Sequence, residues 1–364
     1  MNSPKLRFKE FDDEWEQYKI EDTFENISIK NHPEMVILTI IQGKGTIPRN
    51  QSNRNIIFDE EKSFTYKVVN KSDFIIHLRS FEGGLEMSNH NGIVSPAYTI
   101  LRGNNKVISL FFKYYFRTNK FINGVLSKSV EGIRDGRQIS YNQLKDFYIP
   151  VPSIEEQTKI ANFLSLIDRK IEIQEKLVEN LKLYKKGLLQ KVFSNNQGWK
   201  SAKLGDLTEY YTSNLTFQSL MNINNGNYPV YDASGICNYI NTYQFNFKYI
   251  AIIKDGAGVG RIQLCNEYSS VIGTLGVLKV KKCNTNYLYY ALQTINLKQN
   301  IVGTTIPHIY YKDYKNKLIS CPNIEKQTKI ANLFSTLDRK IELETNRLTK
   351  LKEYKKGLLQ KMFI

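Results

Sequence analysis

The sequence predicts an α+β protein with two globular mixed α/β domains separated by two long antiparallel helices, arranged as a pseudo-twofold internal repeat. Three observations predict this class. The chain has 364 residues, more than one hydrophobic core usually organises. A 45-residue block with the apolar spacing of a long helix occurs twice. Each copy follows a variable region of short β-branched and aromatic runs between glycine and asparagine turns.

The repeat defines the domain organisation. Residues 149–193 and 319–363 align without gaps at an offset of 170 residues, and 27 of the 45 positions are identical. A weaker match around Trp15 and Trp199 precedes the two variable regions. Because a repeat constrains the whole architecture, it is assigned first. It predicts four segments, which are a first domain at 1–148, a central conserved helix at 149–193, a second domain at 194–318 and a C-terminal conserved helix at 319–364.

Both blocks carry an apolar stripe in steps of three and four, which lies on one face of a helix. Gln174 and Lys185 interrupt the first stripe, and Glu344 and Lys355 interrupt the second at matching positions. Shared interruptions indicate a fixed register between the two helices. We expect the stripes to pack together, through Ile160, Leu164, Ile167, Ile171, Val178, Leu181, Leu188, Ile330, Phe334, Leu337, Ile341, Leu348, Leu351 and Leu358. Helices of about 33 residues would be roughly 50 Å long, so this coiled-coil pair would act as a spacer.

The start of each helix is also encoded. A proline precedes each helix, and Ser153 and Asn323 follow as candidate N-caps. Glu156 completes a capping box in the first copy, whereas Lys326 occupies that position in the second.

The composition favours a polyanionic partner. The formal net charge is +16 and the isoelectric point is about 9.4, which favours nucleic acid over a small neutral substrate but does not separate DNA from RNA or a membrane surface. No apolar stretch is long enough to span a bilayer, and the first residues lack an apolar signal core. We therefore expect a cytoplasmic protein. The four cysteines and four histidines show no metal-ligand spacing, so we predict no metal site and buried free thiols.

Motifs of the relevant enzymes are missing. The glycine-rich segment 255–260 lacks the G-x-G-x-x-G spacing and a following G-K-[ST], so a tight turn is the better interpretation. The sequence has no N-P-P-[FY] or D-P-P-Y tetrapeptide of the kind that holds a flipped adenine, no P-loop and no metal-dependent nuclease pattern. We therefore expect no catalytic residues in this chain.

Three motifs, duplicated at the right places, carry a family resemblance over nearly the whole chain. They are the repeated P-x-I-E-x-Q-x-K-I-A segment, the Y-K-K-G-L-L-Q-K-M-F ending and the W-x-x-x-K-L-G-D opening. With them the chain resembles the specificity (S) subunits of type I restriction-modification systems. This resemblance implies that the chain is a non-catalytic, DNA-binding subunit with an internal repeat. It would be part of a complex that methylates adenine in DNA and cleaves DNA. Its two variable regions would be target-recognition domains for a bipartite double-stranded DNA site.

The resemblance also implies the partners. Two methyltransferase (M) subunits would bind around the conserved helices, and two restriction or motor (R) subunits would join for cleavage. The chain itself would need no cofactor, because S-adenosylmethionine, ATP and magnesium would belong to the partners. The charged helix faces at 168–170 and 338–340 could be merely solvated, but the resemblance favours a docking surface.

Candidate DNA-binding residues follow from the same resemblance. The segment 71–102 is similar to a stretch of the family's recognition domains, and residues 303–309 are similar to the segment that closes the second one. We expect Arg79, Ser80, Phe81 and a flexible Gly83-Gly84 pair to form a DNA-facing loop. Arginine suits guanine edges but also serves phosphates and carboxylates, so a hairpin with a structural arginine stays an alternative. The candidates are Arg79, Ser80, Phe81, Gly83, Gly84, Arg134, Arg137, Gln138, Ser140, Lys254, Arg261, Thr304, Thr305 and His308.

Two other classes of function remain open at this point. One is an independent catalytic protein such as a fused methyltransferase, against which the missing tetrapeptide argues. The other is a structural DNA-binding or defence-associated scaffold. Co-purification with a methyltransferase that carries the tetrapeptide would distinguish them.

Overall fold

The structure is a computed structural model that describes residues 3–52, 60–132, 138–220, 226–256 and 258–363. The chain forms two compact units. Unit 1 contains residues 1–175 and 347–364, and unit 2 contains residues 176–346. The chain leaves unit 1 along one long helix and returns to it along the other, so each unit combines one variable region with parts of both conserved helices.

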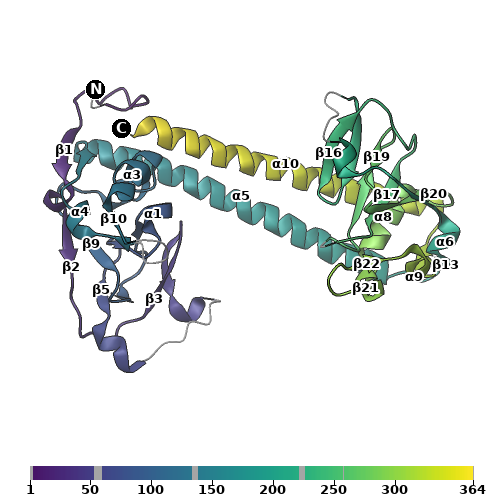
Figure 1. Ribbon diagram of the computed structural model, residues 1–364, viewed down its shortest axis with the longest axis horizontal. Coiled ribbons are helices and arrows are strands. Elements are labelled where there is room, and N and C mark those ends of the chain that lie inside the picture. The colour runs from purple at the N-terminus through teal and green to yellow at the C-terminus, as the bar shows by residue number, and fades with distance from the viewer. Residues whose placement is uncertain (1–2, 53–59, 133–137, 221–225, 257, 364) are drawn as a thin grey trace. The chain divides into compact units, whose positions relative to one another are not determined.

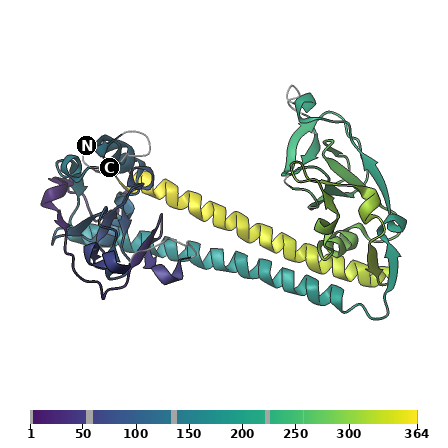
Figure 2. The ribbon, with the colours of Figure 1, turned by 60° about the horizontal axis from the view of Figure 1, so that its bottom comes forward.

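The two conserved helices are α5 (Ile154–Ser194) and α10 (Ile324–Met362). They lie side by side and antiparallel in both units, and each runs without interruption (Figures 1 and 2). The conserved blocks are not helical throughout, because residues 149–151 and 319–321 belong to strands β12 (Tyr148–Val151) and β23 (Leu318–Cys321). A proline follows each of these strands, and the helix begins only after it, because proline disfavours a helical conformation of the residue before it.

The capping prediction is correct in part. The Ser153 Oγ accepts a hydrogen bond from the Glu156 N–H at 3.2 Å, and the Asn323 Oδ1 accepts one from the Lys326 N–H at 2.9 Å. The capping box itself is wrong. The Glu156 carboxylate does not cap the helix but accepts hydrogen bonds from the Arg7 guanidinium and, at 3.1 Å, from the Trp15 indole. Burial of this carboxylate against the N-terminal segment outweighs a local cap.

The variable regions share one sheet topology although their sequences are dissimilar. Unit 1 has an antiparallel four-stranded sheet in the order β2 (Phe24–Ile27), β9 (Thr99–Gly103), β6 (Phe74–Ile76) and β7 (Glu86–Met87). Unit 2 has the equivalent sheet in the order β14 (Thr208–Thr212), β20 (Leu275–Val280), β17 (Tyr249–Ile253) and β18 (Ile262–Cys265). Divergence has therefore changed side chains while keeping strand order.

Smaller elements complete each unit. In unit 1 the strand pairs are β1 (Glu16–Lys19) with β12, β3 (Leu38–Ile41) with β4 (Gly45–Pro48), β5 (Lys67–Val69) with β8 (Gly92–Val94), and β10 (Val130–Glu131) with β11 (Gln138–Ile139). In unit 2 β13 (Lys200–Lys203) pairs with β23, β21 (Ile301–Val302) pairs with β22 (His308–Ile309), and β15 (Tyr228–Asp232) lies between β16 (Gly235–Ile240) and β19 (Ser270–Val271).

The short helices follow the same division. Unit 1 contains α1 (Ser80–Gly83), α2 (Ser109–Tyr115), α3 (Asn119–Gly124) and α4 (Tyr141–Leu144), and unit 2 contains α6 (Leu204–Leu207), α7 (Phe217–Leu220), α8 (Thr285–Gln293) and α9 (Tyr311–Tyr314). Single 3-10 turns occur at Ile20–Asp22, Arg49–Gln51, Glu60–Thr65, Leu126–Ser129 and Leu297–Asn300. Two helices are equivalent between the units, since α2 and α8 both follow the last strand of the sheet.

The apolar stripes of the conserved helices pack into the domain cores as well as against each other. All fourteen stripe residues are buried or half-buried. Ile160, Leu164 and Leu358 share one core cluster with Trp15 and the phenylalanines of α2, and Ile330 and Phe334 share the equivalent cluster of unit 2. Each domain therefore shares one hydrophobic core with the helices. A helix pair that only separated two independent domains would not need such a shared core.

The four cysteines are free thiols, one buried and three half-buried. Burial raises the pKa of the Cys265 and Cys283 thiols to about 12, so both stay protonated at neutral pH. Within the described residues, no helix has the length and apolar character needed to cross a membrane.

Candidate nucleic-acid interface

The fold places the main candidate residues at equivalent points of the two units. In unit 1 the loop between β6 and β7 carries Arg79, and in unit 2 the loop between β17 and β18 carries Lys254. Each loop lies beside the short hairpin that precedes the next conserved helix. Helix α1 contacts β11 in unit 1, and Asp255 forms a β-bridge with His308 in unit 2. Candidate groups that are distant in the sequence therefore come together within each unit.

The candidate residues in the loop between β6 and β7 of unit 1 differ in their exposure to solvent. Arg79 is exposed, whereas Ser80 is fully buried and its Oγ accepts a hydrogen bond from the His77 N–H at 2.9 Å. Phe81 packs against the core of unit 1. Of these three candidates, only Arg79 has an exposed side chain.

The prediction of a flexible Gly83-Gly84 pair in a DNA-facing loop is wrong for Gly84. Gly84 is buried, ends α1 with a φ of +84°, and leaves no room for a side chain because a Cβ would lie 2.1 Å from the Phe116 carbonyl oxygen. Gly83 is half-buried, and a Cβ there would meet the Gln42 side chain. Gly84 thus allows close approach of the Phe116 backbone, which accounts for the glycine at this position.

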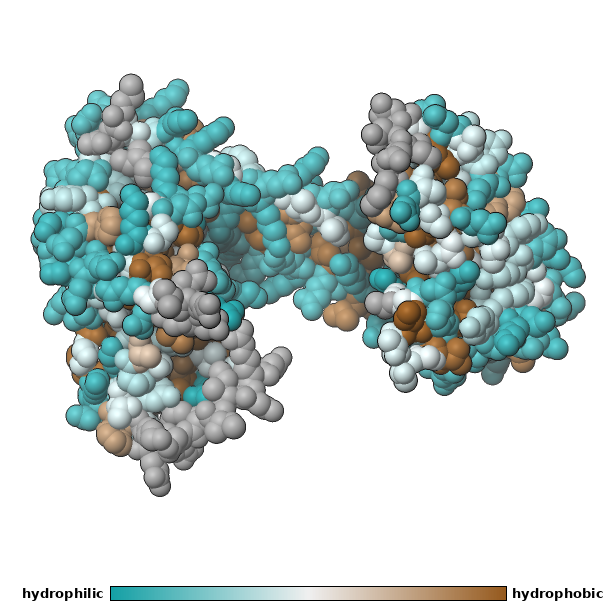
Figure 3. All heavy atoms as spheres, viewed as in Figure 1, coloured by the Kyte–Doolittle hydropathy of each residue, from teal (hydrophilic) through white to brown (hydrophobic). Residues whose placement is uncertain are grey.

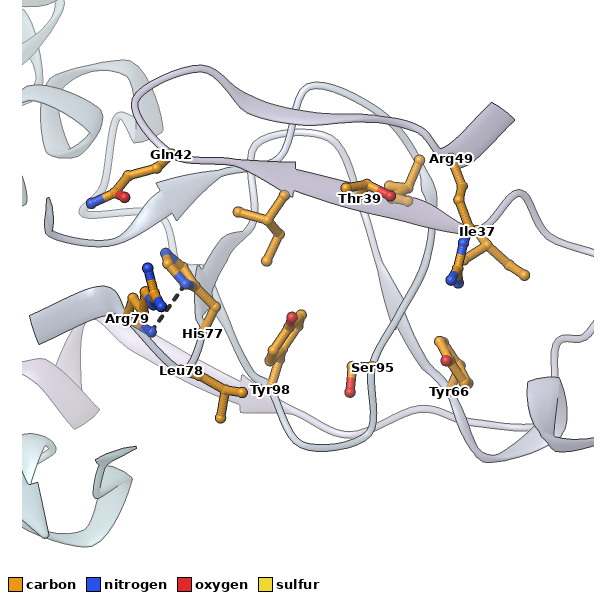
Figure 4. A pocket seen from close by; sticks show the side chains of 12 residues that line it. Ile37, Thr39, Gln42, Arg49, Tyr66, His77, Leu78, Arg79, Ser95 and Tyr98 are labelled. Atoms are coloured by element: carbon orange, nitrogen blue, oxygen red, sulfur yellow. Dashed lines mark hydrogen bonds between the residues drawn. The ribbon is translucent and has the colours of Figure 1, made fainter. Parts of the chain in front are cut away.

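A pocket of about 660 Å³ opens beside Arg79. Its walls are β3 on one side and the segments that follow β6 and β8 on the other (Figure 4). Arg79 and His77 lie at one end, and Arg49 and Tyr66 lie at the other, with Tyr98 between them. The lining residues are Ile37, Leu38, Thr39, Ile40, Gln42, Arg49, Tyr66, His77, Leu78, Arg79, Ser95 and Tyr98.

The chemistry of the pocket is that of a hydrogen-bond donor site with aromatic walls. Burial lowers the pKa of His77, so this imidazole is neutral at pH 7, and its Nδ1 accepts a hydrogen bond from the Arg79 N–H at 3.2 Å. Burial also lowers the pKa of Lys67, whose ammonium donates to the Tyr98 carbonyl at 2.6 Å. Two arginines and tyrosine rings suit phosphate oxygens, guanine edges and stacked bases.

A buried carboxylate holds the β3–β4 hairpin that forms one wall of the pocket. Glu86 is fully buried in β7, and its oxygens accept hydrogen bonds from the Gly43 and Gly45 N–H groups at 2.7 and 3.0 Å and pair with Arg117. The hairpin is further joined to the sheet by a 2.9 Å hydrogen bond between Thr46 and Ser88. Sequence reasoning missed Glu86. The available signal was one carboxylate between Leu85 and Met87 in an apolar strand.

Two further unit 1 candidates, Gln138 and Ser140, lie in or beside the β10–β11 hairpin. Gln138 is exposed on β11, and Ser140 is half-buried at the N-terminus of α4, where its side chain makes no capping hydrogen bond. Arg134 and Arg137 lie outside the described residues. Gln138 therefore joins Arg79 as a side chain that this unit presents to solvent.

The unit 2 site combines the glycine-rich turn with the β21–β22 hairpin. The Lys254 carbonyl accepts a hydrogen bond from the Ile309 N–H at 2.9 Å, and the His308 Nδ1 lies 2.6 Å from the Asp255 carboxylate. The His308 ring also stacks on Tyr310, with the ring planes 16° apart. These contacts give His308 a fixed orientation at the edge of the loop.

The remaining unit 2 candidates surround this pair. Arg261, Thr304 and Thr305 are exposed. The tight-turn interpretation of residues 255–260 is confirmed, because residues 258–260 form a turn and both Gly256 and Gly260 have positive φ values of +90° and +81°. The turn places Lys254 and Arg261 at its two ends, where the Ile253 N–H donates to the Arg261 carbonyl at 2.9 Å.

Fold and site define a twofold-repeated protein that presents a basic loop and an adjoining hairpin in each unit. A family model described as type I restriction modification DNA specificity domain matches the chain twice, at residues 12–183 and 196–353. The chain belongs to this family of type I restriction-modification specificity subunits. The two matches coincide with the two halves of the internal repeat.

Relatives and structural neighbours agree with this assignment. The type I restriction enzyme MjaIX specificity subunit of Methanocaldococcus jannaschii is 24% identical and covers 86% of this chain and 81% of its own. The MjaVIII specificity subunit of the same organism is 22% identical, with 95% and 91% covered. The crystal structure of a type I restriction-modification S subunit from M. genitalium has the same fold, with a TM-score of 0.67, 17% identity, and 100% and 99% of the two chains covered.

Proposed function

We propose that this chain reads a bipartite double-stranded DNA site, with unit 1 reading one half and unit 2 the other, and that it directs partner subunits to methylate adenine or to cleave DNA. The repeat supports this division, because two equivalent sheets present two dissimilar loops. Dissimilar loops on a common scaffold would read dissimilar half-sites. The net charge of +16 supports attraction to the phosphate backbone.

One observation carries the proposal, namely the equivalent placement of the β6–β7 and β17–β18 loops against their hairpins. Unit 1 offers Arg79 and the pocket beside it, and unit 2 offers Lys254, Arg261 and the oriented His308. Arginine and lysine would contact phosphates and guanine edges, while threonine and histidine would contact other base edges.

Partner docking on the conserved helices has its own support. Ile173 and Leu343 are 60% exposed and occupy matching positions of the repeat, and Tyr184 and Tyr354 form a second matching pair, 60% and 56% exposed. Unit 1 thus presents Ile173 and Tyr354, and unit 2 presents Leu343 and Tyr184. Figure 3 shows apolar atoms among hydrophilic ones along the helices. Exposed apolar side chains at matching positions of the repeat suit two copies of one partner, and we assign them to two methyltransferase subunits.

The chemistry would then belong to the partners. Two restriction or motor subunits would join the methyltransferase complex for cleavage, and S-adenosylmethionine, ATP and magnesium would bind to those subunits. This chain would be non-catalytic and would act in the cytoplasm. A purified chain supplied with S-adenosylmethionine should leave DNA unmethylated, while the complex methylates it. Methyl transfer by the chain alone would overturn this part of the proposal.

Domain exchange tests whether each unit reads its own half of the DNA site. Replacement of residues 194–318 by the corresponding region of another family member should change only one half of the methylated site, as read by methylome sequencing of cells that express the complex. Replacement of residues 1–148 should change only the other half, and serves as the matched control. Exchange variants in which both halves change together would contradict independent reading by the two units.

A further inference from the structure

The polar interruption of the second stripe has a specific role in unit 1. The Lys355 ammonium lies 2.5 Å from the Asp168 carboxylate and 5.4 Å from the centre of the Tyr114 ring. The Tyr114 hydroxyl donates a hydrogen bond to the same carboxylate at 2.9 Å. Tyr114 is on α2, Asp168 is on α5 and Lys355 is on α10, so one cluster joins the domain to both conserved helices.

Unit 2 contains the same cluster built from the other copies. Lys185 of α5 pairs with Asp338 of α10, and the Tyr290 hydroxyl of α8 donates to Asp338 at 2.8 Å. The Lys185 ammonium lies 5.3 Å from the centre of the Tyr290 ring. In both units the aspartate and the lysine come from different conserved helices.

The surroundings strengthen both clusters. Tyr114 and Tyr290 are each 2% exposed, and burial followed by the aspartate charge raises the pKa of both phenols, which keeps them protonated as hydrogen-bond donors. The side chains of Lys185 and Lys355 are 16% and 24% exposed. An ammonium so placed costs free energy when its carboxylate is removed, because its hydration is incomplete.

We propose that the two Tyr–Asp–Lys clusters set the register of the antiparallel helix pair and tie the recognition domains to that register. An apolar stripe alone does not specify register, because a slip of seven residues again brings apolar residues together. A seven-residue slip in either direction would place Ala331 or Thr345 opposite Lys185 where Asp338 now lies. Either slip therefore separates the Lys185 ammonium from its carboxylate.

The spacing of the clusters lets both form together. Asp168 and Lys185 are seventeen residues apart on α5, and Asp338 and Lys355 are seventeen residues apart on α10. Equal spacing means that one register of the two helices satisfies both ion pairs. The polar interruptions of the stripes at Lys185 and Lys355 thus serve register selection, as single polar residues do in other helix pairs.

Charge exchange in the full-length chain tests the pairing without reference to DNA. Asp168→Lys should lower the thermal unfolding midpoint by roughly 4 °C or more, since a destabilisation of about 1 kcal/mol already shifts the midpoint by about 2–4 °C in domains of about 150–250 residues. Adding Lys355→Asp should restore most of the loss. Adding Lys185→Asp to Asp168→Lys, the mispaired control, should lower the midpoint further because like charges then face each other in both units. Equal behaviour of the two double variants would overturn the pairing.

A second experiment separates register from stability and rests on the proposed reading of a bipartite site. The complex carrying Lys185→Met and Lys355→Met is titrated with DNA duplexes that differ in the gap, the number of base pairs between the two half-sites. The gap is native, or longer or shorter by about three base pairs, which corresponds in length to a seven-residue slip of the helices. Preference for the native gap should fall at least tenfold. Lys352→Met, which removes a more exposed ion pair with Glu175, should leave the preference unchanged.

The outcomes are distinguishable. An unchanged gap preference in the double lysine variant would overturn the role in register even if the unfolding midpoint fell. Should the wild-type complex bind none of the duplexes specifically, the proposed function would fail, while the charge exchange would still decide whether the lysine–aspartate pairs join the two helices.

Discussion

At the scale of single residues, buried polar groups organise the site. Glu86 accepts hydrogen bonds from two backbone N–H groups of the β3–β4 turn and pairs with Arg117. Arg79, in contrast, is exposed at the mouth of the pocket that this hairpin helps to form. Glu86 positions the wall of the pocket, and Arg79 is the exposed side chain for which we propose DNA contact.

Glu86→Gln should destabilise unit 1. The substitution keeps the size of the side chain but removes the charge that faces the largely buried Arg117, and breaking a buried pair of this kind typically costs about 3–5 kcal/mol. Chemical denaturation of the full chain measures the loss. Glu82→Gln is the matched control, because Glu82 is exposed on α1 and its substitution should change stability by less than about 0.5 kcal/mol. Equal effects of the two substitutions would contradict the role of Glu86.

Arg79→Ala should weaken DNA binding by the complex about tenfold or more, which is about 1–3 kcal/mol for a base contact of arginine. The loss should be confined to the half-site that unit 1 reads, and methylation of that half should become less selective. Lys120→Ala removes another exposed charge of unit 1 outside this pocket and serves as the control. A uniform loss on all DNA sequences would show instead that Arg79 contacts phosphates.

At the scale of elements, one glutamine in each conserved helix connects that helix to its domain. Gln157 is fully buried, its Oε1 accepts a hydrogen bond from the Ile108 N–H at 2.8 Å, and its Nε2 donates to the Pro152 carbonyl at 2.8 Å. Gln327 makes the matching bonds with the Asn284 N–H and the Pro322 carbonyl, each at 2.9 Å. The Q of the repeated motif thus joins the start of α2 or α8 to the start of α5 or α10.

Gln157→Leu and Gln327→Leu should each cost about 1–3 kcal/mol, because backbone groups that are partly or fully buried lose a hydrogen-bond partner. Each substitution should loosen the start of the neighbouring domain helix, α2 or α8, as measured by hydrogen exchange of its first amides. Gln143→Leu alters an exposed glutamine of α4 and is the control. Protection of α2 that survives Gln157→Leu would argue against this connection.

At the scale of the whole molecule, we expect the length of the helix pair to set the gap between the two half-sites, so that the pair would act as a ruler. A seven-residue insertion after Leu181 alone is an inadequate test. It would lengthen the seventeen-residue interval between Asp168 and Lys185 and leave the α10 interval unchanged, so the two clusters could no longer form together. The structure requires matched insertions, after Leu181 in α5 and after Leu351 in α10, which occupy equivalent positions of the repeat.

The doubly inserted chain should read the same two half-sites across a gap that is longer by about three base pairs. Seven residues add about 10 Å to a helix, and base pairs are spaced by about 3.4 Å. Methylome sequencing measures the gap, and the single insertion should lose activity or stability. An active, doubly inserted chain with an unchanged gap would refute the ruler.

Local patterns made part of this protein predictable. The gapless repeat, the stripes in steps of three and four and the proline before each helix predicted two long helices, because periodicity and capping depend on neighbours in the chain. The short β-branched and aromatic runs predicted the mixed domains, and the three duplicated motifs carried the family resemblance. The tight turn at 255–260 was also predicted from its local glycine spacing, whereas Arg79 became a candidate only through the family resemblance. Gly84, predicted as flexible, shows the limit, since only the Phe116 carbonyl beside it reveals why glycine is needed.

The sequence by itself thus determined the repeat, the helices and the family, while the tertiary structure decided which distant groups meet. Glu156 binds Trp15 instead of capping its helix, and the lysine interruptions of the stripes find aspartates on the opposite helix. The pocket beside Arg79 likewise requires β3, far away in the sequence. Such contacts depend on strand order and helix register, and those are set by the burial of whole faces together and not by any short segment.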